Sequence, residues 1–413
     1  MVESSKFLQT SPPVEADVVI VGAGIVGLAT ARELSLRHDG LRVAVLEREA
    51  EPGAHQTGRS SGVIHAGIYY VPGSLKARLC IEGARELYEF CGRRGIPAKR
   101  GGKLIVATRP EEISRLDELE HRGRKNEVPG LRRLGPGEIA EVEPHARGIA
   151  ALHSPATGTV DFRAVTHAYA EDVVAEGGSV ITSCEVRAIR ESEGGVTVGH
   201  TLGTTRANAL VSCAGAWSDR LAVAAGAPAD PRIVPFRGGY LRLRPERAHL
   251  VRSNIYPVPD PDLPFLGAHL TRGHSGEVLL GPTALMVGAL DAYKVGRVRP
   301  AELWHTVSWP GTWRMARNHW RSAATELRHA LRPSALVREA QRFVPELNTS
   351  DFVPGSSGIR AQALARDGSL VDDFVLSRTG RCVHVRNAPS PAATSSLAIA
   401  RLIADEVALE TSG

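Results

Sequence analysis

The apolar positions near the N-terminus change their spacing twice. Residues 17–21 form a β-branched run, residues 25–37 carry apolar side chains at helical spacing, and residues 41–47 form a second apolar run. A strand, a helix and a second strand in this order predict a βαβ unit. The pattern therefore indicates an α/β fold.

A glycine motif stands between the first predicted strand and the helix. Residues 22–27 have Gly-x-Gly-x-x-Gly spacing, which suits a tight turn, the approach of a diphosphate and a close helix–strand contact. The helix then points its free N–H groups at the diphosphate. Glu47 ends the second run, where a carboxylate can bind a ribose hydroxyl. A purely structural turn is the alternative. The cofactor-binding residues expected here are Gly22, Gly24, Ile25, Val26, Gly27, Glu47 and Arg48.

The remaining pattern alternates between helical and strand-rich stretches. Helices are predicted at 74–91, 111–126 and 162–175, over a long region at 301–343, and from Thr394 onward; strands are predicted at 101–109, 209–213 and 381–387. Residues 235–280 form several strands separated by Pro-containing turns, which is typical of an antiparallel sheet. We expect this stretch to lie in a substrate lobe.

Composition narrows the class of protein. The chain has 413 residues, enough for about two lobes, and its 43% hydrophobic content is that of an ordinary globular protein. The net charge of +5 comes without a dense Lys/Arg run, which argues against nucleic-acid binding. No apolar stretch suits a secretory signal or a membrane span, so we expect a cytoplasmic protein. The five cysteines have no metal or redox spacing, so we expect buried reduced thiols and no metal site.

Two features favour FAD over NAD as the dinucleotide. A Gly/Ser-rich loop at 53–67 follows Glu47 directly, so backbone and small side chains can lie along a flavin. A small-residue loop at 388–393 opens the last helix, whose N-terminus can stabilise charge on the reduced flavin. No second glycine motif is found, which disfavours a separate NAD(P)H domain. The further cofactor residues expected are Thr57, Ser60, Ser61, Gly62, Val63, Val186, Ala214, Gly215, Trp217, Pro389, Ser390, Ala392, Ala393 and Thr394.

Five strings in the chain resemble one family. HQTGRSSGVIHAGIYYVPGSLKA, PRIVPFRGGY, NIYPVPDPDLPFLGAHLT, GIRAQALARDGSLVDDF and HVRNAPSPAATSS are similar to segments of the L-2-hydroxyglutarate oxidases and dehydrogenases, which are FAD enzymes of the D-amino-acid oxidase type. The resemblance implies an α/β fold with a discontinuous Rossmann-type FAD-binding domain and a substrate domain with a mainly antiparallel sheet. On this basis the FAD domain comprises 14–95, 145–225 and 350–413, and the substrate domain comprises 96–144 and 226–349.

The resemblance also implies a reaction, with departures that affect the substrate. Family members oxidise a carbinol C–H next to a carboxylate and pass electrons to oxygen or a membrane quinone. This chain differs from the family pattern at Arg59 and Ser60, at Gly239, where an acid is usual, and at Thr283 and the residues that follow it. These changes put the substrate in doubt more than the reaction type.

The chemistry requires a cation for the carboxylate and a base for the hydroxyl proton, with flavin N5 accepting hydride. Arg360 is the expected clamp because a guanidinium binds a carboxylate bidentately; a structural Arg paired with Asp372 or Asp373 is the alternative. His65 is the expected base because an imidazole titrates near neutral pH. A core histidine and a covalent tether to the flavin stay open for His65.

Further residues come from the strand-rich and helical regions. Arg237, Tyr256 and His269 are expected to line the substrate pocket, with a role on the sheet surface equally open. The Trp- and Arg-rich stretch 304–343 could form one amphipathic helix resting on a membrane face, or a lid or packing surface.

The sequence thus predicts FAD-dependent oxidation of a small 2-hydroxy acid, with an L-2-hydroxyglutarate-like compound as the first candidate. Two alternatives stay open. The same fold could oxidise a C–OH or C–N bond in a specialised metabolite, or the chain could bind flavin without turnover as a sensor or subunit.

Overall fold

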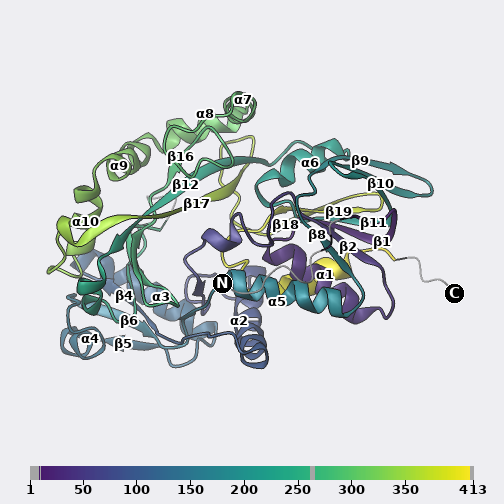
Figure 1. Ribbon diagram of the computed structural model, residues 1–413. Helices are drawn as coiled ribbons and strands as arrows, with labels where there is room; N and C mark the ends of the chain where they lie inside the picture. The colour runs from purple at the N-terminus through teal and green to yellow at the C-terminus, as the bar shows by residue number, and fades with distance from the viewer. Residues whose placement is uncertain (1–8, 10, 261–265, 410–413) are drawn as a thin grey trace.

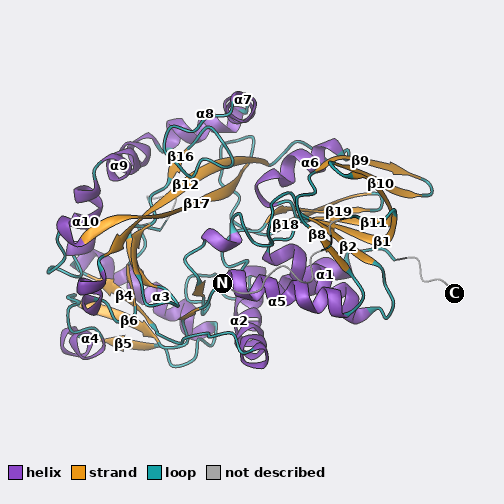
Figure 2. Cartoon of the chain, in the orientation of Figure 1, coloured by secondary structure: helices purple, strands orange, loops and turns teal. Residues whose placement is uncertain are grey.

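Two β-sheets organise the molecule, as the computed structural model shows for residue 9 and for residues 11–260 and 266–409 (Figure 1). The first sheet lies with α1, α2, α5, α6 and α11; the second carries α4 and α7–α10 on its outer side and α3 on the side of the cavity (Figure 2). Residues 261–265, which belong to the predicted strand-rich stretch and to one of the family-like strings, lie outside the described residues.

The first sheet has the strand order β18-β19-β11-β1-β2-β8, with the β9–β10 hairpin added to β11. Its central strands from β19 to β8 are parallel, and residues 18–21 of β1 and all of β2 are apolar and buried, as expected when helices cover a parallel sheet. The predicted βαβ unit is confirmed as β1, α1 and β2. The strands are β1 (Glu15–Val21), β2 (Val43–Leu46), β8 (Ser179–Ile181), β9 (Val186–Ser192), β10 (Gly195–His200), β11 (Gly203–Ser212), β18 (Val375–Thr379) and β19 (Cys382–Asn387).

Five helices accompany this sheet. They are α1 (Ile25–Arg37), α2 (Leu75–Arg94), α5 (Phe162–Ala175), α6 (Ser218–Ala224) and α11 (Ser396–Asp405). Helix α1 packs against both α5 and α11, and its Leu28 and Leu34 are fully buried in the largest core. The last helix begins at Ser396, two residues after the predicted start, because 390–394 form turns. A short pair, β3 (Val63–Ile64) and β7 (Gly158–Thr159), ties the loop after β2 to the segment before α5.

The second sheet is mainly antiparallel, as predicted, with the order β16-β12-β15-β14-β13-β4-β6-β5 and with β17 on the other side of β12. One pair, β13 with β4, is parallel. Its strands are β4 (Lys103–Ala107), β5 (Arg132–Leu134), β6 (Ala150–Ser154), β12 (Arg232–Leu243), β13 (Asn254–Pro257), β14 (His269–Arg272), β15 (Val278–Gly281), β16 (Leu285–Met286) and β17 (Phe352–Leu364). Helices α3 (Ile113–Lys125) and α4 (Pro136–Val142) flank its β4–β6 end.

Two strands of segments assigned to the FAD domain belong to the second sheet. β6 pairs with β4 and β5, and β17 pairs along most of its length with β12, although both segments were assigned to the FAD domain. An apolar strand pattern does not say which sheet the strand joins, and tertiary pairing decides it. The domain limits themselves stay a prediction.

The Trp-rich region is not one long amphipathic helix, so that expectation is wrong. It forms α7 (Pro300–Val307), α8 (Pro310–Asn318), α9 (Trp320–Leu331) and α10 (Pro333–Gln341). Pro310 and Pro333 each stand at the first position of a helix, where a missing N–H costs nothing, and they end the preceding segment. No described helix is long and apolar enough to cross a membrane. All five cysteines are free thiols; Cys80, Cys91, Cys184 and Cys382 are buried, as predicted, and Cys213 is half-buried.

Candidate active site

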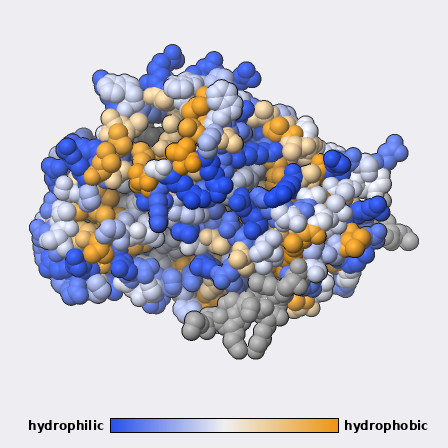
Figure 3. Space-filling view, turned by 45° about the horizontal axis from the view of Figure 1, so that its top comes forward, coloured by the Kyte–Doolittle hydropathy of each residue, from blue (hydrophilic) through white to orange (hydrophobic). Residues whose placement is uncertain are grey.

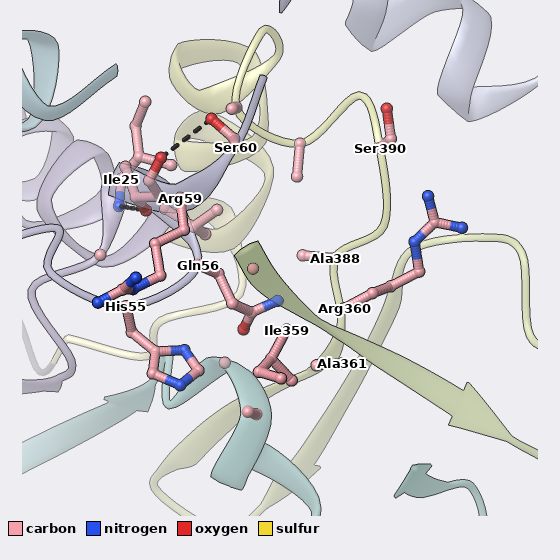
Figure 4. Close-up of a pocket in the computed structure, with 18 of the residues that line it drawn as sticks. Ile25, His55, Gln56, Arg59, Ser60, Ile359, Arg360, Ala361, Ala388 and Ser390 are labelled. Carbon is pink, nitrogen blue, oxygen red and sulfur yellow. Dashed lines mark hydrogen bonds between the residues drawn. The ribbon is translucent and has the colours of Figure 1, made fainter. Parts of the chain in front are cut away.

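A cavity of about 860 Å³ lies between the two sheets. Its wall combines the ends of β1 and β2, the loop after β2, the start of α6, the face of β12 and β17, and the loop after β19. Figure 4 shows His55, Gln56 and Arg59 on one side of the pocket, with Arg360 and Ser390 on the other. The cavity therefore brings together segments that are distant in sequence.

The glycine motif forms one end of this cavity. A Cβ on Gly27 would lie 2.0 Å from the carbonyl oxygen of Gly22, so only glycine allows α1 to approach β1 this closely. Helix α1 has no side-chain cap, and Thr57 Oγ1 accepts a hydrogen bond from the Ile25 N–H at 3.1 Å. The first turn of α1 is part of the cavity lining. Its free N–H groups and the positive end of the helix dipole can therefore bind a diphosphate in the cavity.

Glu47 follows β2 and is held by backbone donors. Its Oε2 accepts from the Ala23 N–H at 2.7 Å, and its Oε1 accepts from the Glu49 N–H at 2.8 Å. Burial raises the pKa of the Glu47 carboxyl, while these two hydrogen bonds oppose the rise. Nearby, the Arg48 guanidinium lies 4.1 Å from the Trp217 ring centroid, and both line the cavity. The pair offers a flat surface of the kind on which a purine stacks.

Nearly all the predicted cofactor residues line this one cavity. They are Gly22, Gly24, Ile25, Val26, Gly27, Glu47, Arg48, Thr57, Ser60, Ser61, Gly62, Val63, Val186, Ala214, Gly215, Trp217, Ser390, Ala392, Ala393 and Thr394. Pro389 is outside the lining, and Ser390 and Pro391 take its place, because the loop turns at this point. An elongated molecule with a diphosphate at α1 and a ring system near 390–394 fits this set of residues.

His65 lies beside the loop after β19. Its backbone N–H donates to Thr394 Oγ1 at 3.1 Å, and its Nε2 lies 3.3 Å from Ser390 Oγ. Burial lowers the pKa of His65 to about 3, and the nearby cations Lys103 and Lys76 and the ring of His269 add to the effect. The imidazole is therefore unprotonated near neutral pH.

Arg360 lies on β17, opposite Phe236 of β12, and it lines the cavity. Its surroundings lower the pKa of the guanidinium mainly by desolvation, while Tyr240 and Asp372 oppose that effect. Asp372 itself is bound by Lys76, whose Nζ lies 2.7 Å from Asp372 Oδ1. One of the two acids named in the structural alternative, Asp372, thus has an ion pair with a lysine.

Arg237 is the one predicted substrate residue that lies outside the cavity lining. Around Arg237, successive side chains of β12 point to opposite faces, and Phe236, Gly238 and Tyr240 line the cavity; Ile233, further along the strand, lines it as well. Arg237 instead donates from Nε to the Tyr293 carbonyl at 2.9 Å. Gly239 is not part of the lining; a Cβ on it would lie 2.6 Å from Arg237 Nη1, and its N–H donates to Thr283 Oγ1 at 3.0 Å. Arg59, Ser60 and Thr283 do line the cavity.

Tyr256 and His269 line the cavity, as expected, and their rings stack at 3.9 Å. His269 Nδ1 lies 2.9 Å from the Gly267 carbonyl oxygen, and burial lowers the pKa of His269 to about 3. Three neighbours were missed from the sequence as site candidates: Lys103, which is fully buried beside Tyr256, and Tyr240 and Lys76, which line the cavity. A lysine inside the apolar run GGKLIVA was the available signal for Lys103.

Comparison with known proteins agrees with this geometry. Residues 17–406 match the family model described as FAD dependent oxidoreductase, known as DAO. The chain belongs to this family of FAD-dependent oxidoreductases. As a member it binds FAD and catalyses a flavin-dependent redox reaction, which confirms the predicted cofactor, enzyme class and fold.

Several known proteins are similar to this chain in sequence or in fold. L-2-hydroxyglutarate dehydrogenase of Caenorhabditis elegans is 47% identical over 94% of this chain and 92% of its own length, and the human enzyme is 46% identical over 95% and 88%. The enzyme of Indibacter alkaliphilus is 43% identical over 92% and 96%. L-α-glycerophosphate oxidase of Mycoplasma pneumoniae has the same fold, with a TM-score of 0.76 at 24% identity over 95% of this chain and 94% of that one.

Proposed function

We propose that the protein oxidises L-2-hydroxyglutarate to 2-oxoglutarate. The observation that carries this proposal is the identity of 43–47% over nearly the full chain with enzymes named L-2-hydroxyglutarate dehydrogenase. The cavity supports it independently, because a guanidinium and a neutral imidazole line the same space as the FAD-binding motif.

The residues of the cavity suit the removal of two electrons and a proton from a 2-hydroxy acid. Arg360 binds the carboxylate next to the reacting carbon and fixes its orientation. His65 accepts the hydroxyl proton at Nε2, where the substrate hydroxyl takes the place of Ser390 Oγ, which lies 3.3 Å from this atom. Bound FAD supplies the acceptor for the hydride that leaves the same carbon.

His269 is the alternative proton acceptor, because its Nδ1 faces the Gly267 carbonyl and an Nδ1–H there leaves Nε2 with a free lone pair. We favour His65 because it adjoins the flavin-side loop through both Thr394 and Ser390. A His65→Gln variant with a strongly reduced rate of flavin reduction, beside a His269→Gln variant with a rate near wild type, would support this assignment. The reverse order would transfer the role to His269.

Arg360→Lys tests the carboxylate clamp. We expect KM for L-2-hydroxyglutarate to rise by about tenfold or more, since a lysine cannot form the two parallel hydrogen bonds of a guanidinium. The content of bound FAD should stay at the wild-type level, because Arg360 lies on β17 and not in the glycine motif. Steady-state kinetics and flavin absorbance measure both quantities. Unchanged KM would remove Arg360 from the substrate site.

We further propose that reduced enzyme passes its electrons to a quinone-type acceptor at a membrane surface. The surface of α7–α9 carries exposed Trp304, Trp313 and Trp320, at 70%, 64% and 62% exposure. Exposed leucines and arginines lie among them, namely Leu303, Leu327, Leu331, Arg314, Arg317, Arg321 and Arg328. Figure 3, in which this side comes forward, shows apolar and hydrophilic side chains mixed on the face. Indole rings with interspersed arginines suit the interface of an anionic bilayer.

A further inference from the structure

Lys103 is an unusual buried cation beside the cavity. It begins β4 and pairs with Asn254 on one side and Ser154 on the other, and its side chain is 1% exposed. Its Nζ lies 4.2 Å from the ring centroid of Tyr256 and 5.1 Å from that of Tyr69. Both tyrosines line the cavity and Lys103 does not, so the ammonium lies just outside the lining, over the rings of two residues that form it.

The surroundings of Lys103 contain no compensating negative charge. In the described part of the chain no ion pair joins Lys103 to a carboxylate, and the titratable groups that act on it or are acted on by it are Cys80, His65, His269 and the two tyrosines. Burial lowers the pKa of Lys103 to about 7. An ammonium taken out of water without an anion is costly, and the cost is recovered when an anion binds beside it.

A second polar group at the same wall also lacks a partner. The Tyr69 hydroxyl is buried and forms no hydrogen bond with any described residue. Buried hydroxyls are nearly always paired, so an unpaired one at a binding cavity indicates a group that a ligand completes. Tyr69 Oη and Lys103 Nζ are both donors, and both therefore suit an acceptor that carries negative charge.

We propose that Lys103 and the Tyr69 hydroxyl form a second anion subsite, which binds the carboxylate of the substrate remote from the reacting carbon. This inference rests on the proposed function, in which Arg360 binds the near carboxylate. One cation for each carboxylate, Arg360 and Lys103, favours a dicarboxylate over a 2-hydroxy acid that ends in a methyl group. The subsite thus makes Lys103 a specificity-determining residue.

The test compares ligands that differ only in the second carboxylate. Anaerobic reduction of the FAD-loaded enzyme is measured with L-2-hydroxyglutarate and with L-2-hydroxyvalerate, in which a methyl replaces that carboxylate. For Lys103→Met we expect the concentration of L-2-hydroxyglutarate giving half-maximal reduction to rise by about tenfold or more, the size of one lost charge-assisted contact. The value for L-2-hydroxyvalerate should change by less than about twofold. Tyr69→Phe should act in the same direction with a smaller effect.

Lys99→Met is the matched control, because this lysine near the start of β4 is exposed and its side chain donates to the His274 carbonyl oxygen. Lys103→Met should melt at a higher temperature than wild type, because removing an unpaired buried cation relieves a desolvation cost. A higher melting temperature shows that the variant is folded. Equal losses for both ligands, or no loss for either, would overturn the subsite.

A binding experiment separates this inference from the proposed function. Glutarate and valerate differ by the same carboxylate and need no turnover, and their binding is followed by perturbation of the flavin spectrum. Weaker binding of glutarate alone in Lys103→Met would support the subsite even if wild-type enzyme failed to oxidise L-2-hydroxyglutarate. Unchanged glutarate binding would contradict the subsite whatever the enzyme oxidises.

Discussion

At the scale of single residues, the proposed reaction depends on an imidazole kept neutral by its surroundings. His65 has a pKa of about 3, because it is buried and faces the cations Lys103 and Lys76 and the ring of His269. A base works only when unprotonated, so its activity is lost as pH falls through its pKa. Since that pKa lies far below the ordinary 6.5 of histidine, the free enzyme should keep its base down to acidic pH.

This gives a prediction for the pH profile of kcat/KM. We expect no acid limb with an apparent pKa near 6.5, and a decline only at much lower pH. In Lys103→Met the acid limb should move upward, because one positive charge near the imidazole is removed. The measurement is kcat/KM for L-2-hydroxyglutarate across a buffered pH series. A wild-type limb centred near 6.5 would contradict a buried His65 as the base.

At the scale of elements, the contact between α1 and β1 positions the cofactor. Gly27→Ala should weaken FAD binding by about tenfold or more and lower Tm, because the new methyl would meet a backbone oxygen and displace the helix N-terminus. Gly137→Ala in α4 is the control, since it is exposed and a Cβ there meets nothing within 4 Å. FAD titration of the apoprotein measures the difference. Equal affinities for the two variants would show that the close contact is dispensable.

The same scale shows what the sequence could predict. The βαβ unit of residues 17–47 and the helices α2 and α5 could be predicted, because hydrophobic periodicity and glycine positions are local signals. The placement of β6 and β17 in the second sheet could not, because pairing between distant strands leaves no local mark. Arg237 was assigned to the substrate pocket for a related reason. Which face of a strand borders the cavity is known only once the pairing of the strands is known, and in β12 the Arg237 side chain lies outside the cavity lining.

Residue identity explains why some site groups were predicted and others missed. Arg360 and His65 were proposed because their chemistry stands out next to glycine-rich turns, and both residues line the cavity. Lys103 was missed because a lysine at the start of a strand is normally exposed, and only the pairing of β4 with both β13 and β6 buries it.

At the scale of the whole molecule, the two sheets enclose the cavity while α7–α9 stand on the outside of the second sheet (Figure 1). We expect the protein to sediment with anionic vesicles and much less with neutral ones. Replacing Trp313 and Trp320 together by Ser should reduce that binding by about tenfold, because two indole rings leave the interface. Flavin reduction by substrate should be unaffected. Equal sedimentation of variant and wild type would exclude this surface as the contact.

The central proposal is that one cavity holds FAD and a 2-hydroxy dicarboxylate together. The most direct test mixes the FAD-loaded protein with L-2-hydroxyglutarate in the absence of oxygen and follows the absorbance of the oxidised flavin. We predict that this absorbance is lost and that 2-oxoglutarate forms in equal amount to the flavin reduced. Absorbance that stays unchanged with this substrate, in protein whose flavin is reduced by light, would contradict the account.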